Sequence, residues 1–364
     1  MKIKNSLRFM GILLASYGLL GSCTDIYNLP EDRDFISDEI KYDNLVLEPI
    51  LGRTNLFSTL NPNNSTLPLK FEIINARYGD GRPVTDLFQK VPTYEWITEY
   101  DGLENSLAEI EAKRKLVNKS LLEIDSLGRI ILWGSSSNEL IAPRPVDTVL
   151  KTQDIRFFDI KITNTGGSKI LKDFQLIPWF QRDYSPSTDI NPYTGGVAPD
   201  PKSPKDPSKQ DYIIPAWIST NLIGEQTERR LENNSERKDI VVYIRKFEGG
   251  NGNNLRFKFM AKDGTFINPL KFNETKWDLL VHGFNKTVNT EYVQYDVAYP
   301  IPLTNYRTDY VNGDHARVEF AYSRMARNGV RERANLGLDF RIFKQGDWEI
   351  IFHFRNDNPK FEDD

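Results

Sequence analysis

Short segments in which apolar and polar residues alternate recur along this chain from about residue 44 to its end, and they limit the folds open to it. Residues 67–78 (LPLKFEIINARY) and residues 255–260 (LRFKFM) show the pattern most clearly. A period of two sends successive side chains to opposite faces, as in a half-buried β-strand. The fold class is therefore predicted to be mostly β. Further strands are expected at residues 93–97, 155–163, 170–176, 239–247, 292–299, 316–322, 334–343 and 348–355.

One helix and several tight turns are expected between the strands. Residues 104–117 place several apolar side chains near one face and set two Glu–Lys pairs four residues apart, which favours a helix. Asp125 and Gly128 suit the first and last positions of a type I turn. Three further glycine-containing segments are each expected to close a β-hairpin, namely residues 164–167, 249–252 and 344–347.

A proline-rich segment divides the chain. Eight of the 20 prolines fall within residues 178–215, and proline lacks the backbone donor that a β-ladder needs. This segment is expected to be a long connecting loop and a domain boundary, because a chain of 364 residues corresponds to about two domains. Residues 44–177 are predicted to form an immunoglobulin-like β-sandwich with one inserted helix. Residues 216–364 are predicted to form a second, jelly-roll-like β-sandwich.

The N-terminal residues predict a lipoprotein leader. Three basic residues precede the apolar run of residues 9–20, which as a helix would reach about 18 Å, less than the roughly 30 Å hydrocarbon core of a bilayer. The sequence LGSC, which ends at Cys23, has the order of a bacterial lipobox, and Cys23 is the only cysteine. Residues 1–22 are therefore expected to be a signal peptide, Cys23 the lipidated residue, and residues 23–43 an acidic tether.

Composition and motifs argue against several functional classes. The formal net charge of −4 shows no basic excess, so a nucleic-acid partner is not expected. A single cysteine and only three histidines, His282, His315 and His353, argue against a metal centre, and no cofactor is expected. The sequence has no nucleophile elbow, HExxH pair or phosphate-binding glycine loop, so we predict no catalytic residues and a non-enzymatic protein.

Aromatic residues gather in and around the proline-rich segment. Their flat apolar faces suit stacking against the C–H face of a sugar, while polar neighbours hold its hydroxyls, so we predict a glycan-binding site there. In an alternative interpretation, Trp179 and Trp217 fill the two cores where the segment leaves and enters them. Trp277 and Trp348 are expected in a core. The residues of the predicted site are Trp179, Phe180, Arg182, Tyr184, Tyr193, Tyr212 and Trp217.

Several longer motifs together resemble one protein family. They are YEW at residues 94–96, LLEIDSLGRI at 121–130, IRFFDIKITNTGG at 155–167, FNETKWDLLVHGF at 272–284 and GDWEIIFHF at 346–354. With the lipobox leader, they resemble the Bacteroidetes outer-surface lipoproteins of the uncharacterised DUF5007 type, over nearly the whole mature chain. This family offers no activity to carry over to a residue. The resemblance implies a lipid-anchored protein of the outer membrane and cell surface, near a glycan-uptake system.

The expected function is therefore binding at the cell surface by a non-enzymatic or accessory module. The membrane would be contacted through the lipid on Cys23, and the further partner would be a glycan or an outer-membrane transporter. A structural adhesin or assembly subunit is the first alternative. A glycoside hydrolase is the second, because carboxylates are numerous and a catalytic pair has no fixed sequence spacing.

Overall fold

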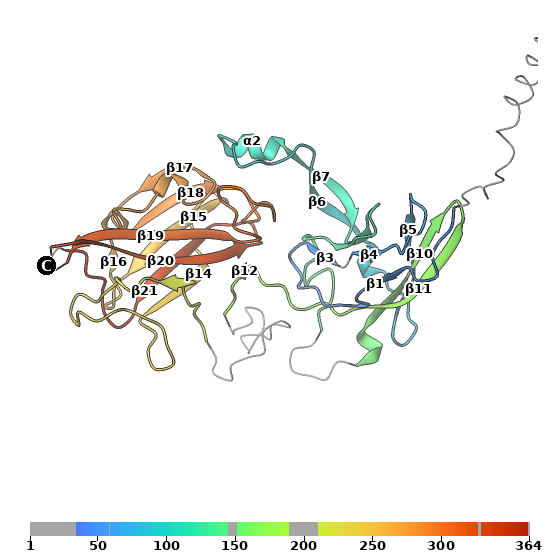
Figure 1. Ribbon diagram of the computed structural model, residues 1–364, viewed down its shortest axis with the longest axis horizontal. Helices are drawn as coiled ribbons and strands as arrows, with labels where there is room; N and C mark the ends of the chain where they lie inside the picture. The colour runs from blue at the N-terminus through green and yellow to red at the C-terminus, as the bar shows by residue number, and fades with distance from the viewer. Residues whose placement is uncertain (1–33, 58, 145–150, 189–209, 327–328, 363–364) are drawn as a thin grey trace, which may run out of the picture.

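The computed structural model describes residues 34–57, 59–144, 151–188, 210–326 and 329–362 (Figure 1). The fold is mostly β, as predicted, and the described residues contain one α-helix. The strands form two bodies, each with its own buried apolar cluster. One cluster draws on residues between 40 and 176, and the other on residues between 213 and 354. Short 3₁₀ helices occur at η1 (Asp86–Phe88), η2 (Thr152–Asp154), η3 (Pro269–Lys271) and η4 (Trp277–Leu279).

The first body packs two sheets around one core. Its strands are β1 (Lys41–Tyr42), β2 (Val46–Leu47), β3 (Asn55–Phe57), β4 (Leu60–Asn61), β5 (Lys70–Tyr78), β8 (Leu122–Ile124), β9 (Ile130–Leu132), β10 (Arg156–Asn164) and β11 (Gly167–Leu176). The larger sheet has the order β2-β11-β10-β5 and the smaller one the order β3-β9-β8, while β1 and β4 form a separate pair. Phe158 and Phe174 of the larger sheet stack with centroids 5.3 Å apart, and Leu132 of the smaller sheet joins the same cluster. Two sheets that share a core in this way agree with the predicted sandwich.

Two local turn predictions are confirmed in this body. β10 and β11 pair antiparallel and are joined through residues 165–166, which makes the predicted hairpin. At the other turn, a carboxylate oxygen of Asp125 accepts the N–H groups of Leu127 and Arg129, both at 2.9 Å. Gly128 closes this turn with φ 79°, a backbone conformation that glycine adopts at little cost because it has no Cβ.

A two-stranded arm extends from the first body toward the second (Figure 1). It consists of β6 (Lys90–Trp96), α2 (Leu107–Ala112) and β7 (Arg114–Ser120), with β6 and β7 paired antiparallel along their whole length. The helix predicted over residues 104–117 is therefore wrong in its second half. The hydroxyl of Ser106 caps α2, but the chain beyond Lys113 pairs with β6 instead, because a full ladder outweighs small differences in helix propensity.

The second body is also built from two sheets. Its strands are β12 (Tyr184–Ser185), β13 (Trp217–Ile218), β14 (Ile240–Lys246), β15 (Asn254–Met260), β16 (Phe266–Ile267), β17 (Gly283–Val288), β18 (Tyr292–Val297), β19 (Ala316–Met325), β20 (Arg331–Ile342) and β21 (Trp348–Phe354). The larger sheet has the order β14-β21-β15-β18-β17, with β16 also paired to β15. The smaller sheet is built on β20, which pairs with β19, β12 and β13.

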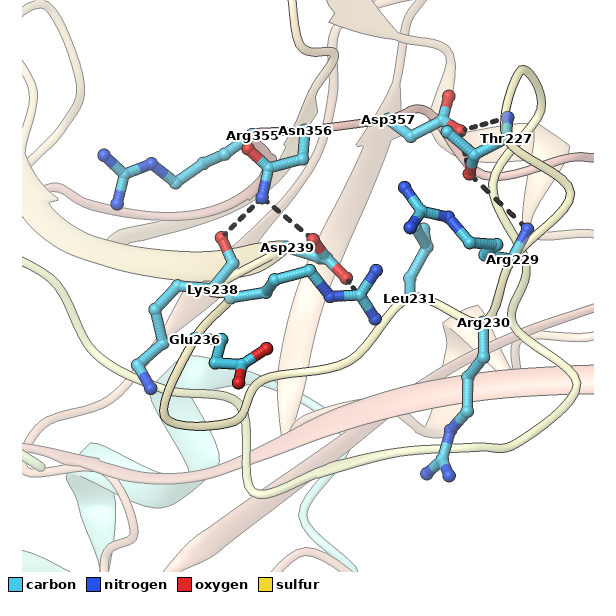
Figure 2. A pocket seen from close by; sticks show the side chains of 11 residues that line it. Thr227, Arg229, Arg230, Leu231, Glu236, Lys238, Asp239, Arg355, Asn356 and Asp357 are labelled. Carbon is cyan, nitrogen blue, oxygen red and sulfur yellow. Dashed lines mark hydrogen bonds and ion pairs between the residues drawn. The ribbon is translucent and has the colours of Figure 1, made fainter.

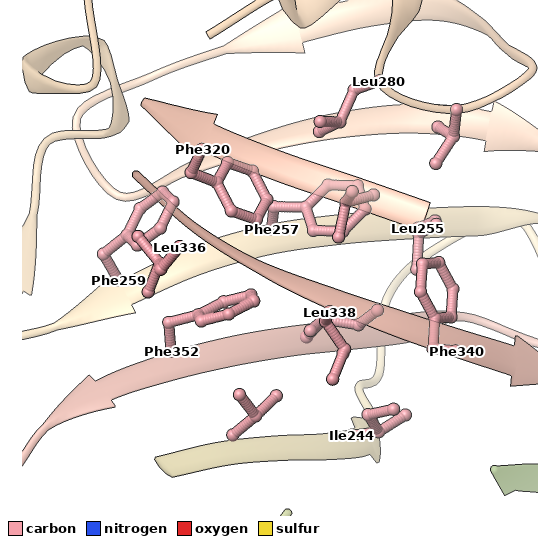
Figure 3. Close-up of a cluster of buried hydrophobic side chains, with 14 of the residues drawn as sticks. Ile244, Leu255, Phe257, Phe259, Leu280, Phe320, Leu336, Leu338, Phe340 and Phe352 are labelled. Carbon is pink, nitrogen blue, oxygen red and sulfur yellow. The ribbon is translucent and has the colours of Figure 1, made fainter. Parts of the chain in front are cut away.

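An aromatic cluster fills the space between these two sheets (Figure 3). Phe257 and Phe259 come from β15, Phe320 from β19 and Phe352 from β21, and all four are fully buried. The ring centroid of Phe259 lies 4.9 Å from that of Phe320 and 5.9 Å from that of Phe352. Rings from both sheets therefore interlock in a single core, as the predicted second sandwich requires.

The strand order of the larger sheet corrects two turn predictions. Residues 249–252 do not close a hairpin, because β21 lies between β14 and β15. Residues 344–347 do not close one either, because β20 and β21 belong to different sheets. β21 runs antiparallel to β14 and parallel to β15, and nearly all its residues are buried, which suits a central strand. As predicted, Trp348 is in this core and Trp277 packs against it.

The proline-rich segment leaves the first body at Trp179, which bridges to Ile50, and its later described residues belong to the second body. Tyr184 and Ser185 form β12 on the edge of β20, and Ile213 makes an isolated bridge to Val242. Part of the expected loop therefore enters a β-ladder, which ends at Pro186, where no N–H is available. Residues 189–209 lie outside the described residues.

Candidate functional site

The first members of the predicted aromatic site lie on the first body or in the loop that leaves it. Trp179 makes an isolated bridge to Ile50, and the guanidinium carbon of Arg144 lies 4.2 Å from the centre of its ring. Phe180 is half-buried beside it. Arg182 is 9% exposed and donates hydrogen bonds within its own loop. Both charged side chains therefore have structural partners at this end of the segment.

The next two members lie on the two faces of the smaller sheet in the second body. Tyr184 packs against the core, with its ring centroid 5.9 Å from that of Trp348. Trp217 pairs with Gly337 on the outer face of β20, where the guanidinium carbon of Arg317 lies 5.2 Å from its ring centre. The space over Gly337 is occupied by the Trp217 ring, since a Cβ there would come within 2.0 Å of it. Trp217 thus covers a sheet face and does not fill the core.

The remaining members are placed elsewhere or are not described. Tyr212 has the guanidinium carbon of Arg355 5.4 Å from its ring centre. Tyr193 and Cys23 lie outside the described residues. The described rings of the predicted site therefore each have different neighbours, and their role as one glycan site stays a prediction.

A second group of aromatic side chains is exposed on the arm. Cross-strand pairing sets Tyr94 opposite Leu116 and Trp96 opposite Arg114, so these four side chains share one face, which we call the aromatic face. Tyr94 is 45% exposed, Trp96 36% and Leu116 58%. The opposite face of the arm holds Val91, which packs against the first core. One face of the arm is thus tied to the protein, while the other presents two rings to solvent.

Arg114 holds the rings of the aromatic face in place. Its guanidinium carbon lies 4.2 Å from the ring centre of Tyr94 and 5.8 Å from that of Trp96. Its Nε donates to a carboxylate oxygen of Glu111 at 2.9 Å, and a terminal nitrogen donates to the carbonyl of Tyr299 at 2.6 Å. A guanidinium fixed from two sides and stacked on aromatic rings limits the movement of those rings.

Polar groups border the aromatic face toward the base of the arm. On the same face of the arm, the next cross-strand pair is Pro92 with Asn118, and the one after it is Lys90 with Ser120. The side chains of Lys90 and Asn118 are exposed. Ammonium, amide and hydroxyl groups together supply hydrogen-bond donors and acceptors. The face therefore combines flat apolar rings with neighbouring groups that bind hydroxyls.

Buried contacts dock the far end of the arm on the second body. The hydroxyl of Tyr100 lies 2.6 Å from Nδ1 of His282, and Nε2 of the same ring lies 2.8 Å from the carbonyl oxygen of Glu104. Tyr310 stacks on the His282 ring at 4.7 Å, and Ile110 of α2 is fully buried nearby. Burial, together with the charge of Glu104, raises the pKa of Tyr100 well above its usual value, so its hydroxyl stays protonated.

The part of the chain that the structure describes lacks two other kinds of feature, a metal-binding cluster and a membrane-spanning helix. There, no three His, Cys, Asp or Glu side chains gather in a way that would hold a metal ion. No helix in that part has the length and the apolar composition needed to cross a membrane.

Comparison with known proteins places this architecture in a family. A family model described as a domain of unknown function, DUF5007, matches residues 60–363. The chain belongs to this family. The DUF5007 match spans the arm, most of the first body and nearly all of the second, so the aromatic face lies within the family region. No curated protein and no solved structure matches the chain.

The sequence of this DUF5007 protein predicts one strand of the aromatic face but not the face itself. Tyr94 and Trp96 are two residues apart in the predicted strand, and this spacing already places them on one side. The sequence does not identify their cross-strand partners, because Arg114 and Leu116 lie within the segment that was predicted to be helical. The available signal was the YEW motif, in which two aromatic residues flank a charged one.

Proposed function

We propose that this DUF5007 protein is a lipid-anchored, non-enzymatic binding protein of the outer membrane and cell surface, and that its aromatic face binds carbohydrate. The observation that carries the proposal is the pair of exposed rings, Tyr94 and Trp96, held on one face by the buried guanidinium of Arg114. A sugar presents an apolar C–H face that stacks on such rings and hydroxyls that bond to groups beside them.

The fixed geometry of the face favours binding. Rings that are already held in position lose little side-chain entropy when a ligand stacks on them. Tyr94 and Trp96 follow each other at a spacing of about 7 Å along the strand. An extended chain of sugar units can contact both rings at once, which suits a polysaccharide better than a single sugar.

The carboxylates of the arm support binding rather than catalysis. A glycoside hydrolase uses two carboxyl groups that flank the scissile bond and are free to act as acid, base or nucleophile. On the arm, three glutamates are instead engaged with basic side chains. These pairs are Glu95–Lys119 at 2.9 Å, Glu104–Lys113 at 2.5 Å and Glu111–Arg114 at 2.9 Å.

The anchor is proposed from the leader. Cys23 follows a lipobox-like sequence, and two or three acyl chains on its sulfur and amino group would hold the protein stably on a membrane. We place the protein at the outer membrane, beside a transporter of a nutrient-uptake system, because a surface-held polysaccharide binder would supply such a transporter. Residues 23–43 would act as the tether.

Affinity electrophoresis of the full chain through gels that contain single polysaccharides tests the binding proposal. We expect at least one polysaccharide to retard the wild-type chain. Tyr94→Ala and Trp96→Ala should each weaken this retardation about tenfold or more, as loss of a central aromatic contact does. Trp217→Ala, which removes a ring from the second body, is the matched control and should be retarded like the wild type.

Two results would contradict the carbohydrate proposal. One is the absence of retardation by every polysaccharide in a broad panel. The other is equal retardation of the wild type and the Tyr94→Ala chain. Tyr94 is the more decisive position, because Trp96 also contacts Tyr100 with ring centroids 5.7 Å apart and its loss could disturb the docking of the arm.

One observation favours the alternative of an assembly subunit or adhesin. β6 and β7 pair only with each other among the described strands, so each has an outer edge that another strand could pair with. Pro92 lowers this capacity in β6, since it has no N–H, and leaves the edge of β7 as the better template. Crosslinking on intact cells through a photoreactive residue at position 115, in place of Lys115, distinguishes the assembly role from carbohydrate binding alone. A stoichiometric protein neighbour supports the alternative, and capture of the chain alone contradicts it.

A further inference from the structure

A cavity of about 530 Å³ opens between two loops of the second body (Figure 2). One loop is formed by residues 225–239 and leads into β14, and the other, residues 355–357, directly follows β21. This volume falls within the range of small-molecule sites and is much larger than a bare inorganic ion needs. The cavity shares no residue with the aromatic face.

Two buried aspartates hold the loops together around the cavity. Asp357 is 2% exposed and accepts the N–H and the hydroxyl of Thr227 at 2.8 and 2.7 Å. Asp239 is 2% exposed and accepts the side-chain amide of Asn356 at 2.8 Å and the N–H of Glu232 at 2.9 Å. Each aspartate therefore accepts a hydrogen bond that links the two loops. These donors already satisfy its charge.

The remaining charges of the lining are mostly positive. Arg237 is paired with Glu232 at 2.8 Å, and the ammonium of Lys238 donates to the carbonyl of Asn234. Among the described residues, Arg229 and Arg230 have no carboxylate partner. In Figure 2, Arg229 extends from its loop toward the centre of the view.

Two further charged side chains complete the lining. Arg355 lies over the ring of Tyr212, with its guanidinium carbon 5.4 Å from the ring centre. Glu236 contributes one exposed carboxylate that pairs with no basic side chain among the described residues. Among the described residues, the lining thus contains three arginines without a carboxylate partner and one exposed carboxylate, which leaves a positive surplus for a ligand. In Figure 2, Arg229 extends toward the hollow, whereas Arg230 and Arg355 extend away from it.

We propose that this cavity binds a small organic molecule that carries an oxyanion, namely a carboxylate, sulfate or phosphate group. Guanidinium groups bind such groups through paired N–H donors, and the rigid loops fix the direction from which Arg229 approaches. The volume leaves room for a body about the size of one or two sugar rings beside the charged group. The inference rests on the cavity alone and holds whether or not the aromatic face binds carbohydrate.

Isothermal titration calorimetry with the full chain tests the proposal. The probes are glucuronate, glucose 6-phosphate and galactose 6-sulfate, with glucose as the neutral counterpart. We expect at least one charged probe to bind and glucose not to bind. Arg229→Ala should weaken that binding about tenfold or more, since a hydrogen bond to a charged group is lost. Binding should also weaken as the salt concentration rises.

Arg307→Ala is the matched control, because Arg307 is an exposed arginine that lies outside the cavity. It should leave the affinity within twofold of the wild type, and so should Tyr94→Ala on the aromatic face. Both arginines are exposed, so folded spectra are expected for both variants. The proposal is overturned if no charged probe binds, if glucose binds equally well, or if Arg229→Ala and Arg307→Ala have the same effect.

Discussion

The buried ring of Phe259 is a single side chain on which the stability of the second body depends strongly. Its centroid lies 4.0 Å from that of Phe272, and the rings of Phe320 and Phe352 close around its other sides. Replacing it with alanine leaves a hole that rigid neighbours fill only in part. We expect Phe259→Ala to lower the free energy of unfolding by about 3–5 kcal/mol, measured from urea denaturation.

Leu279 provides the control for this prediction. It is 60% exposed, so Leu279→Ala should change the free energy of unfolding by less than about 0.5 kcal/mol. Equal urea midpoints for the two variants would show that the aromatic cluster does not carry the stability assigned to it.

The lowered pKa of Asp357 leads to a prediction of how the stability of the protein changes with pH. Burial opposes its charge, but the hydroxyl and N–H of Thr227 and the N–H of Gln226 outweigh burial and lower the pKa of this carboxyl. A carboxyl whose native pKa is lowered stabilises the fold above its unfolded pKa of about 3.9, and this contribution is lost as the pH falls through the lower native value.

Asp357→Asn should therefore destabilise the protein at pH 7, and the difference from wild type should shrink as the pH falls below about 3.9 toward the lower native pKa. The measurement is the urea midpoint of wild type and variant across this range, with Asp173→Asn, an exposed carboxyl, as the control. A difference between Asp357→Asn and wild type that stays constant from pH 7 to pH 3 would contradict the assignment.

Contacts of His282 and of helix α2 dock the arm on the second body. Both ring nitrogens of His282 form hydrogen bonds with arm residues, and Ile110 of α2 is buried in one apolar cluster with Tyr100. His282→Ala removes two hydrogen bonds of about 1 kcal/mol each, so amide exchange in α2 should rise about tenfold or more. Hydrogen–deuterium exchange read by mass spectrometry measures this.

The control for the arm is Lys115→Ala, which alters an exposed residue of β7 without touching the docking contacts. Exchange in α2 should then match the wild type, and exchange in β21 should stay unchanged in both variants. Unchanged exchange in α2 of the His282→Ala chain would mean that the arm does not depend on this contact.

Sequence patterns predicted those elements whose causes are local. The hairpin of β10 and β11 and the turn at Asp125 depend on residues within a few positions of one another, and both were predicted. The place of β21 between β14 and β15 depends on pairing with a distant strand, for which alternation gives no signal. The second half of the predicted helix failed for the same reason, because β6 supplies the partners of β7.

The candidate site shows the same limit. Side-chain spacing in the YEW motif puts Tyr94 and Trp96 on one face, but only the position of the first core decides which face of the arm is exposed. The proline content of residues 178–215 predicts a loop, and the aromatic residues in this loop were the basis of the predicted glycan site. Its described aromatic residues have separate neighbours, as the contacts of Trp179 and Tyr184 show.

The proposed lipid anchor concerns the whole molecule, because it would hold both bodies at a membrane. Cys23→Ser removes the only thiol that could carry lipid. We expect the wild-type chain to incorporate labelled palmitate and to sediment with membranes, and the variant to do neither. Ser22→Ala keeps a small residue before the cysteine and should behave as the wild type. A Cys23→Ser chain that stays in the membrane pellet would contradict the anchor.

The proposed function requires carbohydrate to bind at the aromatic face of the arm. Hydrogen–deuterium exchange of the full chain, with and without a polysaccharide that retards it, shows where the ligand binds. We expect the polysaccharide to slow exchange in β6 and β7 and to leave residues 179–188 and 212–217 unchanged. Slower exchange at 179–188 or 212–217, with β6 and β7 unaffected, would place the site in the proline-rich segment and overturn the proposal.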